Sequence, residues 1–76
     1  MRKIDSDVCH AEFGQYIKTA RKERKLTQTD VAEALGVSRV YVSYIERGQR
    51  EVDLADALRI CEVLGVDIRD FVSRYM

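Results

Sequence analysis

The stretch from Thr27 to Arg47 reads TQTDVAEALGVSRVYVSYIER. Thr27 and Asp30 have the three-residue spacing at which a hydroxyl and a carboxylate cap the start of a helix reciprocally. Gly36 falls where a chain leaving a helix often takes a positive φ, and Ser38 is a suitable cap for a second helix. The stretch therefore predicts two short helices joined by a tight turn.

The second of these helices has two unlike faces. Val42 and Ile45 lie three residues apart on one face, at helical spacing. The opposite face mixes aliphatic, hydroxyl, aromatic and guanidinium groups, whereas a solvated face usually carries Glu and Lys. This mixture suits the base edges, methyl groups and phosphates of a DNA major groove. The outward side chains are Val40, Ser43, Tyr44 and Arg47, with Arg39 and Tyr41 on the flanks.

Length and composition limit the number of domains, the type of secondary structure and the location that can be expected for the chain. The 76 residues make one domain, 1–76, and the lack of proline favours helix. The charged segment 1–7 is expected to be frayed. No apolar run approaches the roughly 20 residues that span a membrane, and no signal-peptide segment is evident. We therefore expect a cytoplasmic protein with no membrane partner.

The net charge is zero, but the charges are unevenly distributed. Residues 21–50 hold seven basic and four acidic side chains, whereas residues 51–76 hold three basic and six acidic ones. The basic excess coincides with the two-helix stretch. A small DNA-binding protein with one face on phosphates has this kind of asymmetry.

The sequence gives little support to an enzyme. Cys9 and Cys61 are far apart in the sequence and have no ligand cluster around them, so we expect two reduced thiols, with Cys61 in the core. His10 beside Cys9 has no evident acidic partner to orient it. No glycine-rich phosphate loop is present. We expect no catalytic residues, metal, cofactor or small-molecule ligand.

The segment from Gln28 to Arg47 resembles the helix-turn-helix of the phage repressor and Cro family, also called XRE-type. The resemblance rests on Gln28, Ala32 where the helices cross, Gly36 in the turn, and apolar Val31, Leu35, Val37, Val42 and Ile45. It extends upstream through FGQYIKTARKERKLTQ and downstream through IERGQREVDLADALRICEVLGVDIRDFV. It implies an all-α, compact five-helix lambda-repressor-like domain from a prokaryote or phage. The expected helices span about 8–24, 28–35, 39–47, 54–64 and 68–75.

The resemblance also implies a function and a set of contacts. The chain would be a sequence-specific, double-stranded DNA-binding transcriptional regulator, with its third helix (Arg39–Arg47) in the major groove. The expected contacts are Gln28 to a phosphate, Arg39, Val40 and Tyr44 to bases, Ser38, Tyr41 and Ser43 as secondary candidates, and Arg47 and Arg50 to the DNA backbone. Arg21 and Glu46 match an ion pair of the family; the alternative is two unrelated surface charges.

The C-terminal helices suggest how two copies would pair. In the fourth helix, the expected apolar side is Leu54, Leu58, Cys61 and either Ile60 or Leu64. By resemblance, Phe71, Val72, Tyr75 and Met76 contribute to a two-fold homodimer that reads a near-palindromic operator. The alternative is that they close the core of the monomer. The alternative function is a protein-interaction module that keeps the fold without binding DNA.

Overall fold

The computed structural model describes residues 3–76, which form five α-helices, a short 3₁₀ helix and no strand. The helices are α1 (Ser6–Glu23), α2 (Gln28–Leu35), α3 (Arg39–Glu46), α4 (Leu54–Leu64) and α5 (Ile68–Val72), and the 3₁₀ helix spans Ser73–Tyr75. The predicted all-α architecture with five helices is confirmed.

The first helix begins earlier than predicted. The Asp5 carboxylate accepts a hydrogen bond from the Val8 N–H at 3.1 Å and caps α1. Ser6 and Asp7, which the sequence places in the frayed start, therefore belong to the first turn. Residues 1 and 2 of that expected segment lie outside the described residues.

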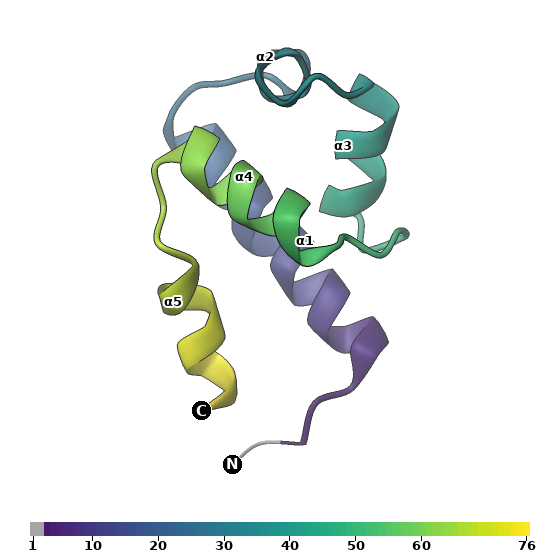
Figure 1. Cartoon of the computed structure of the whole chain (residues 1–76), viewed down its shortest axis with the longest axis vertical. Coiled ribbons are helices and arrows are strands. Elements are labelled where there is room, and N and C mark those ends of the chain that lie inside the picture. Colours follow the sequence, from purple (N-terminus) through teal and green to yellow (C-terminus); the bar gives the residue numbers. More distant parts are fainter. Residues whose placement is uncertain (1–2) are drawn as a thin grey trace.

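The short helices lie at two opposite ends of the molecule (Figure 1). α2 lies at one end with α3 beside it, and α5 lies toward the other end with the C-terminus. α1 passes behind α4, and its N-terminal end lies toward the same end of the molecule as α5. Figure 1 views α2 along its axis and α3 from the side, so these two helices cross steeply.

All five helices contribute to one core. Its buried apolar side chains are Phe13, Ile17, Ala20, Val31, Ala32, Leu35, Val42, Ile45, Ala57, Ile60, Cys61, Leu64, Phe71 and Tyr75. Both cysteines are free thiols, and burial raises the pKa of Cys61. The core side chains of α2 and α3 include the apolar positions on which the family resemblance rests.

The C-terminal aromatic residues complete this core. The Phe71 ring packs against Phe13, with centroids 5.2 Å apart, and against Tyr16 and Tyr75. The Tyr75 hydroxyl donates to the Glu12 carboxylate of α1. Phe71 and Tyr75 thus close the core of the monomer, which is the alternative that the sequence left open. Their contribution to a dimer interface stays a prediction. Val72 and Met76 remain exposed.

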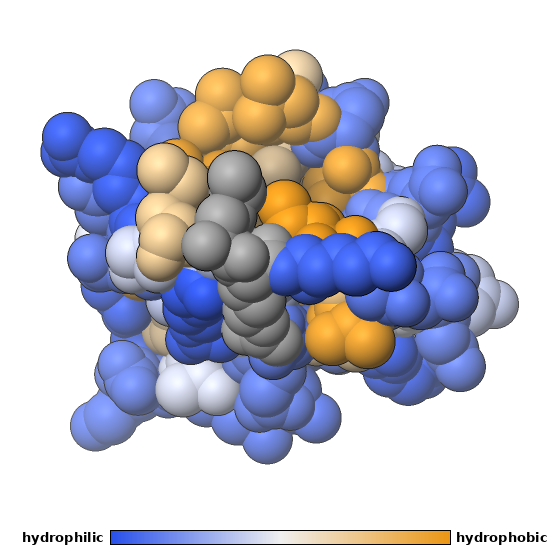
Figure 2. Space-filling view, turned by 90° about the horizontal axis from the view of Figure 1, so that it is seen from below, coloured by the Kyte–Doolittle hydropathy of each residue, from blue (hydrophilic) through white to orange (hydrophobic). Residues whose placement is uncertain are grey.

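The inward face of α4 also differs from the prediction. Ala57, Ile60, Cys61 and Leu64 are buried, whereas Leu54 and Leu58 are 72% and 46% exposed. At about 100° per residue the two leucines lie to one side of the buried stripe. Figure 2 shows apolar side chains gathered on the end of the molecule that carries the C-terminus.

Gly14 lets α1 and α3 approach at backbone distance. A Cβ at this position would lie 2.3 Å from the Ile45 carbonyl oxygen and 2.7 Å from that of Glu46. Helix propensity alone disfavours glycine by about 1 kcal/mol relative to alanine. The close contact explains why glycine stands inside α1.

Gly14→Ala should therefore destabilise the fold by about 1–3 kcal/mol despite the better helix propensity of alanine. Urea unfolding measures this change. Gln15→Ala, at an exposed position of the same helix, is the control and should change the free energy of unfolding by less than about 0.5 kcal/mol. A Gly14→Ala chain more stable than the wild type would contradict the proposed contact.

Candidate nucleic-acid interface

The turn after α2 sets the direction of α3. Gly36 has a φ of 71° and ends α2 in the left-handed conformation. The Val37 N–H donates to the Ala32 carbonyl at 3.0 Å, the hydrogen bond that closes a Schellman motif. The Ser38 hydroxyl then accepts from the Tyr41 N–H at 3.1 Å and starts α3. The predicted tight turn and the Ser38 cap are confirmed.

The start of α2 carries the predicted capping box. The Asp30 N–H donates to the Thr27 hydroxyl at 3.0 Å, and the Thr27 N–H donates to the Asp30 carboxylate at 2.8 Å. The hydrogen bonds from the Thr27 backbone and side chain lower the pKa of Asp30. Unpaired N–H groups and the helix dipole make such a helix start suitable for an anion.

α3 has one buried and one exposed face. Val42 and Ile45 are each 1% exposed, as their spacing predicts. Val40 is 48% exposed and Tyr44 is 41% exposed, so an aliphatic and an aromatic side chain both lie on the outward face of α3. The exposed residues at α3 and its ends include Ser38, Arg39, Val40, Tyr44, Arg47, Gln49 and Arg50.

Ser43 does not lie on this exposed face. Its residue is 9% exposed and belongs to the buried set of α3. At about 100° per residue Ser43 lies only about 60° around the helix from Glu46, which is itself buried. The prediction that Ser43 faces outward is therefore wrong.

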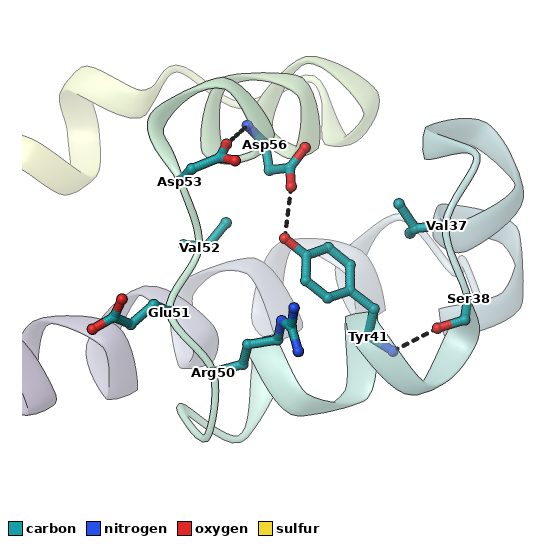
Figure 3. A pocket seen from close by; sticks show the side chains of 8 residues that line it. All are labelled: Val37, Ser38, Tyr41, Arg50, Glu51, Val52, Asp53 and Asp56. Atoms are coloured by element: carbon teal, nitrogen blue, oxygen red, sulfur yellow. Dashed lines mark hydrogen bonds between the residues drawn. The ribbon is translucent and has the colours of Figure 1, made fainter.

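Tyr41 is turned toward α4 and is only half-exposed. Its hydroxyl donates to the Asp56 carboxylate at 2.6 Å, across an open hollow of about 580 Å³ beside the start of α3 (Figure 3). Burial and then the hydrogen bond to Asp56 raise the pKa of Tyr41 to about 12. In this position the hydroxyl binds the protein itself, so Tyr41 is not a free donor on the exposed face.

Two exposed arginines lie over aromatic rings. The Arg47 guanidinium is 5.1 Å from the Tyr44 ring centroid, and its Nε donates to the Gln49 side chain at 2.9 Å. The Arg50 guanidinium is 5.0 Å from the Tyr41 centroid. Cation–π contacts of this kind hold the positive charges in place at the end of α3 and in the loop that follows.

The predicted ion pair between Arg21 and Glu46 is present. Arg21 Nε donates to one Glu46 carboxylate oxygen at 2.7 Å, and Nη2 donates to the other at 3.1 Å. Nη1 of Arg21 donates to the Leu26 carbonyl at 2.9 Å. The alternative of two unrelated surface charges is excluded, since both residues are buried.

Gln28 is half-buried at the first residue of α2. Its amide nitrogen donates to the Glu46 carboxylate at 3.1 Å, and its amide oxygen accepts from Arg39 at 3.4 Å. The amide nitrogen carries two hydrogens, so one remains for another acceptor. Gln28 and Arg39, predicted as separate DNA contacts, are thus brought together.

Asp56 is a site residue that the sequence did not reveal. It accepts from Tyr41 and lies 3.5 Å from Arg59, whose guanidinium also donates to the Leu35 carbonyl at 2.8 Å. In the sequence Asp56 looks like an acidic residue in the first turn of a helix, which is common at any helix start. Its contact with Tyr41 depends on how α4, which packs against α1 and α2, lies relative to α3, for which the sequence has no local signal.

No metal site is apparent in the part of the chain described here, where nowhere do three His, Cys, Asp or Glu side chains gather to hold an ion. Over residues 3–76, no helix combines the length and apolar character needed to cross a membrane.

A capped helix, a glycine turn and an exposed helix bearing arginines and aromatics define a helix-turn-helix domain. A family model described as helix-turn-helix matches residues 17–71. The chain belongs to this family, whose XRE-type members are DNA-binding transcriptional regulators and not enzymes.

The relatives include phage and restriction–modification proteins. An immunity repressor protein of Bacillus phage phi105 is 41% identical over 60 residues, covering 79% of this chain and 42% of the repressor. Control protein C.MunI of a Mycoplasma species is 36% identical over 62 residues, covering 80% of this chain and 84% of that protein. The chain thus spans less than half the length of the phage repressor.

A solved structure supports the lambda-repressor-like fold. The restriction–modification controller C.AhdI from Aeromonas hydrophila superimposes with a TM-score of 0.74 at 35% sequence identity. The superposition covers 79% of this chain and 91% of that one.

Asp56→Asn should lower the pKa of Tyr41 from about 12 toward its ordinary value of 10.0, because it replaces a charged acceptor by a neutral one. The folded-state pKa of Tyr41 is raised, so its neutral form stabilises the fold fully below pH 10. That contribution is lost as the pH rises through about 12. A pH titration of the Tyr41 ring Cζ resonance measures the pKa.

Asp70→Asn, which removes an exposed carboxylate from α5, is the matched control and should leave the titration of Tyr41 unchanged. An unaltered Tyr41 pKa in the Asp56→Asn chain would contradict the contact between the two side chains.

Proposed function

We propose that this chain is a sequence-specific regulator of transcription whose α3 enters the major groove of double-stranded DNA. The observation that carries this proposal is the exposed face of α3, on which Arg39, Val40 and Tyr44 project away from a buried Val42–Ile45 seam. Relatives that are named as repressors and control proteins support it.

The base-reading contacts follow from the chemistry of these side chains. Arg39 can donate two hydrogen bonds to O6 and N7 of one guanine. Val40 suits a thymine methyl group, and Tyr44 can donate to a base edge or a phosphate. Ser38 and Tyr41 remain secondary candidates, with Tyr41 having to leave Asp56 to donate to DNA.

The backbone contacts surround this face. Arg47 and Arg50 are exposed cations at the end of α3 and in the loop after it. At the start of α2, Gln28 has one amide hydrogen left for a phosphate. These groups would bind any sequence and fix the register of α3, while Arg39 and Val40 discriminate between sequences.

We propose further that two copies pair through α4, α5 and the C-terminal turn. The exposed apolar side chains there are Leu54, Leu58, Val72 and Met76. Leu54, Val72 and Phe71 line a shallow hollow of about 300 Å³ on this surface. A two-fold dimer would place two α3 helices roughly 34–36 Å apart and read a near-palindromic operator.

Arg39→Ala should weaken binding to an operator selected from a random duplex library by about 1–3 kcal/mol and relax the preference at one base pair. Arg50→Ala should weaken binding to all duplexes and flatten the slope of log K against log salt by about one unit. Gel shifts with operator and random DNA at several salt concentrations measure both effects. Equal losses on the two kinds of DNA for Arg39→Ala would contradict its base-reading role.

Leu54→Lys should convert a dimer at micromolar concentration to a monomer, because it places a charge in the apolar interface. Sedimentation equilibrium measures the mass. Ala34→Lys, at an exposed position of α2 away from this surface, is the matched control and should remain dimeric. A wild-type chain that sediments as a pure monomer would rule out a dimer formed before DNA binding.

A further inference from the structure

The outward face of α3 carries an apolar patch formed by Val40 and Tyr44. The two residues are 48% and 41% exposed and stand four positions apart in the helix. Residues at this spacing are neighbours on a helix surface, with Cβ atoms roughly 5–6 Å apart. Arg39 precedes Val40 at the start of α3, and the Arg47 guanidinium lies over the Tyr44 ring. The Val40–Tyr44 patch therefore has an arginine before it and one after it in the chain.

These two arginines restrict what can cover the patch. An apolar protein surface would cover the guanidinium groups of Arg39 and Arg47 without supplying negative charge, which is unfavourable. A DNA duplex supplies phosphates for such cations, and its major groove also offers one apolar group. That group is the methyl at C5 of thymine, which the other three bases lack. The patch and its charged surroundings therefore fit a methylated pyrimidine better than an apolar protein partner.

We propose that the Val40–Tyr44 patch reads the C5-methyl group of a pyrimidine and so distinguishes 5-methylcytosine from cytosine at one position of the operator. Methylation of cytosine at C5 places in the major groove the same group that thymine carries there. The inference rests on the proposed function and extends it, because the affinity of the chain for its operator then depends on whether that cytosine is methylated.

Both side chains of the patch are needed for this discrimination. Complete removal of one methyl group from water changes an affinity about fourfold. Val40 alone covers only one side of such a methyl group, and the Tyr44 ring supplies apolar surface beside it. The ring is itself restrained, because Arg47 lies over it and donates from Nε to Gln49 at 2.9 Å.

Base analogues test the methyl contact on the DNA side. In an operator selected from a random duplex library, each thymine is replaced in turn by uracil, which removes only the methyl group. Fluorescence anisotropy titrations with the wild-type chain should show that one such replacement weakens binding about fourfold. At that position the chain should bind 5-methylcytosine about fourfold more tightly than cytosine. Binding that is equal for the two cytosines, or tighter for the unmethylated one, would overturn the proposal.

Substitutions in the chain test the contact on the protein side. Val40→Ala and Tyr44→Ala should each reduce the ratio of affinities for 5-methylcytosine and cytosine to less than about twofold. Val8→Ala is the matched control, because it makes the same change at a valine of α1 that is 47% exposed. It should keep the fourfold ratio of the wild type. A ratio that survives both Val40→Ala and Tyr44→Ala would assign the methyl contact to other residues and overturn the proposal.

The same experiments separate this inference from the function on which it rests. A library selection that yields no operator overturns the proposed function together with this inference. An operator that is selected and bound, but whose affinity is unchanged by every replacement of thymine by uracil, overturns this inference alone.

Discussion

The paired contact between the Arg21 guanidinium and the Glu46 carboxylate joins α1 to α3 across the core. The two side chains are 11% and 3% exposed, so the charges lie away from solvent. A buried ion pair adds little net stability compared with apolar packing, but two parallel hydrogen bonds fix the relative orientation of the groups they join. Together with the close backbone approach at Gly14, this pair determines how α3 lies on α1. The exposed face of α3 follows from that arrangement.

The three arginines of the proposed interface are each held by a different neighbour. Arg39 contacts Gln28, Arg47 lies over Tyr44, and Arg50 lies over Tyr41. Fewer rotamers are then left to be lost on binding, which is the general advantage of a preorganised surface. The neighbours of Arg39 and Arg50 are themselves held by different contacts. Gln28 donates to the buried Glu46 carboxylate, whereas the Tyr41 hydroxyl donates to Asp56 on α4.

Local patterns in the sequence predict the helices and their caps well, because a cap depends on residues within one turn. Which side of a helix the other helices cover is less predictable from the sequence. A helical wheel gives the angle of Ser43 relative to Val42, but not how far the neighbouring helices cover that side of α3. The same limit explains why the exposure of Leu54 and Leu58 was not predicted from the sequence. Phe71 was predicted at a dimer surface, and its burial depends on α1, which lies far away in the sequence. The family resemblance supplied the Arg21–Glu46 pair, whereas nothing local indicated the contact between Tyr41 and Asp56.

The proposed function depends on α3 being the surface that meets DNA. A titration of the isotope-labelled chain with a selected operator duplex, followed through backbone and arginine side-chain resonances, tests this directly. We expect the largest chemical-shift changes on Arg39, Val40, Tyr44 and Arg47, with further changes at the start of α2. Changes confined to α4 and α5, with the resonances of α3 unmoved, would contradict it.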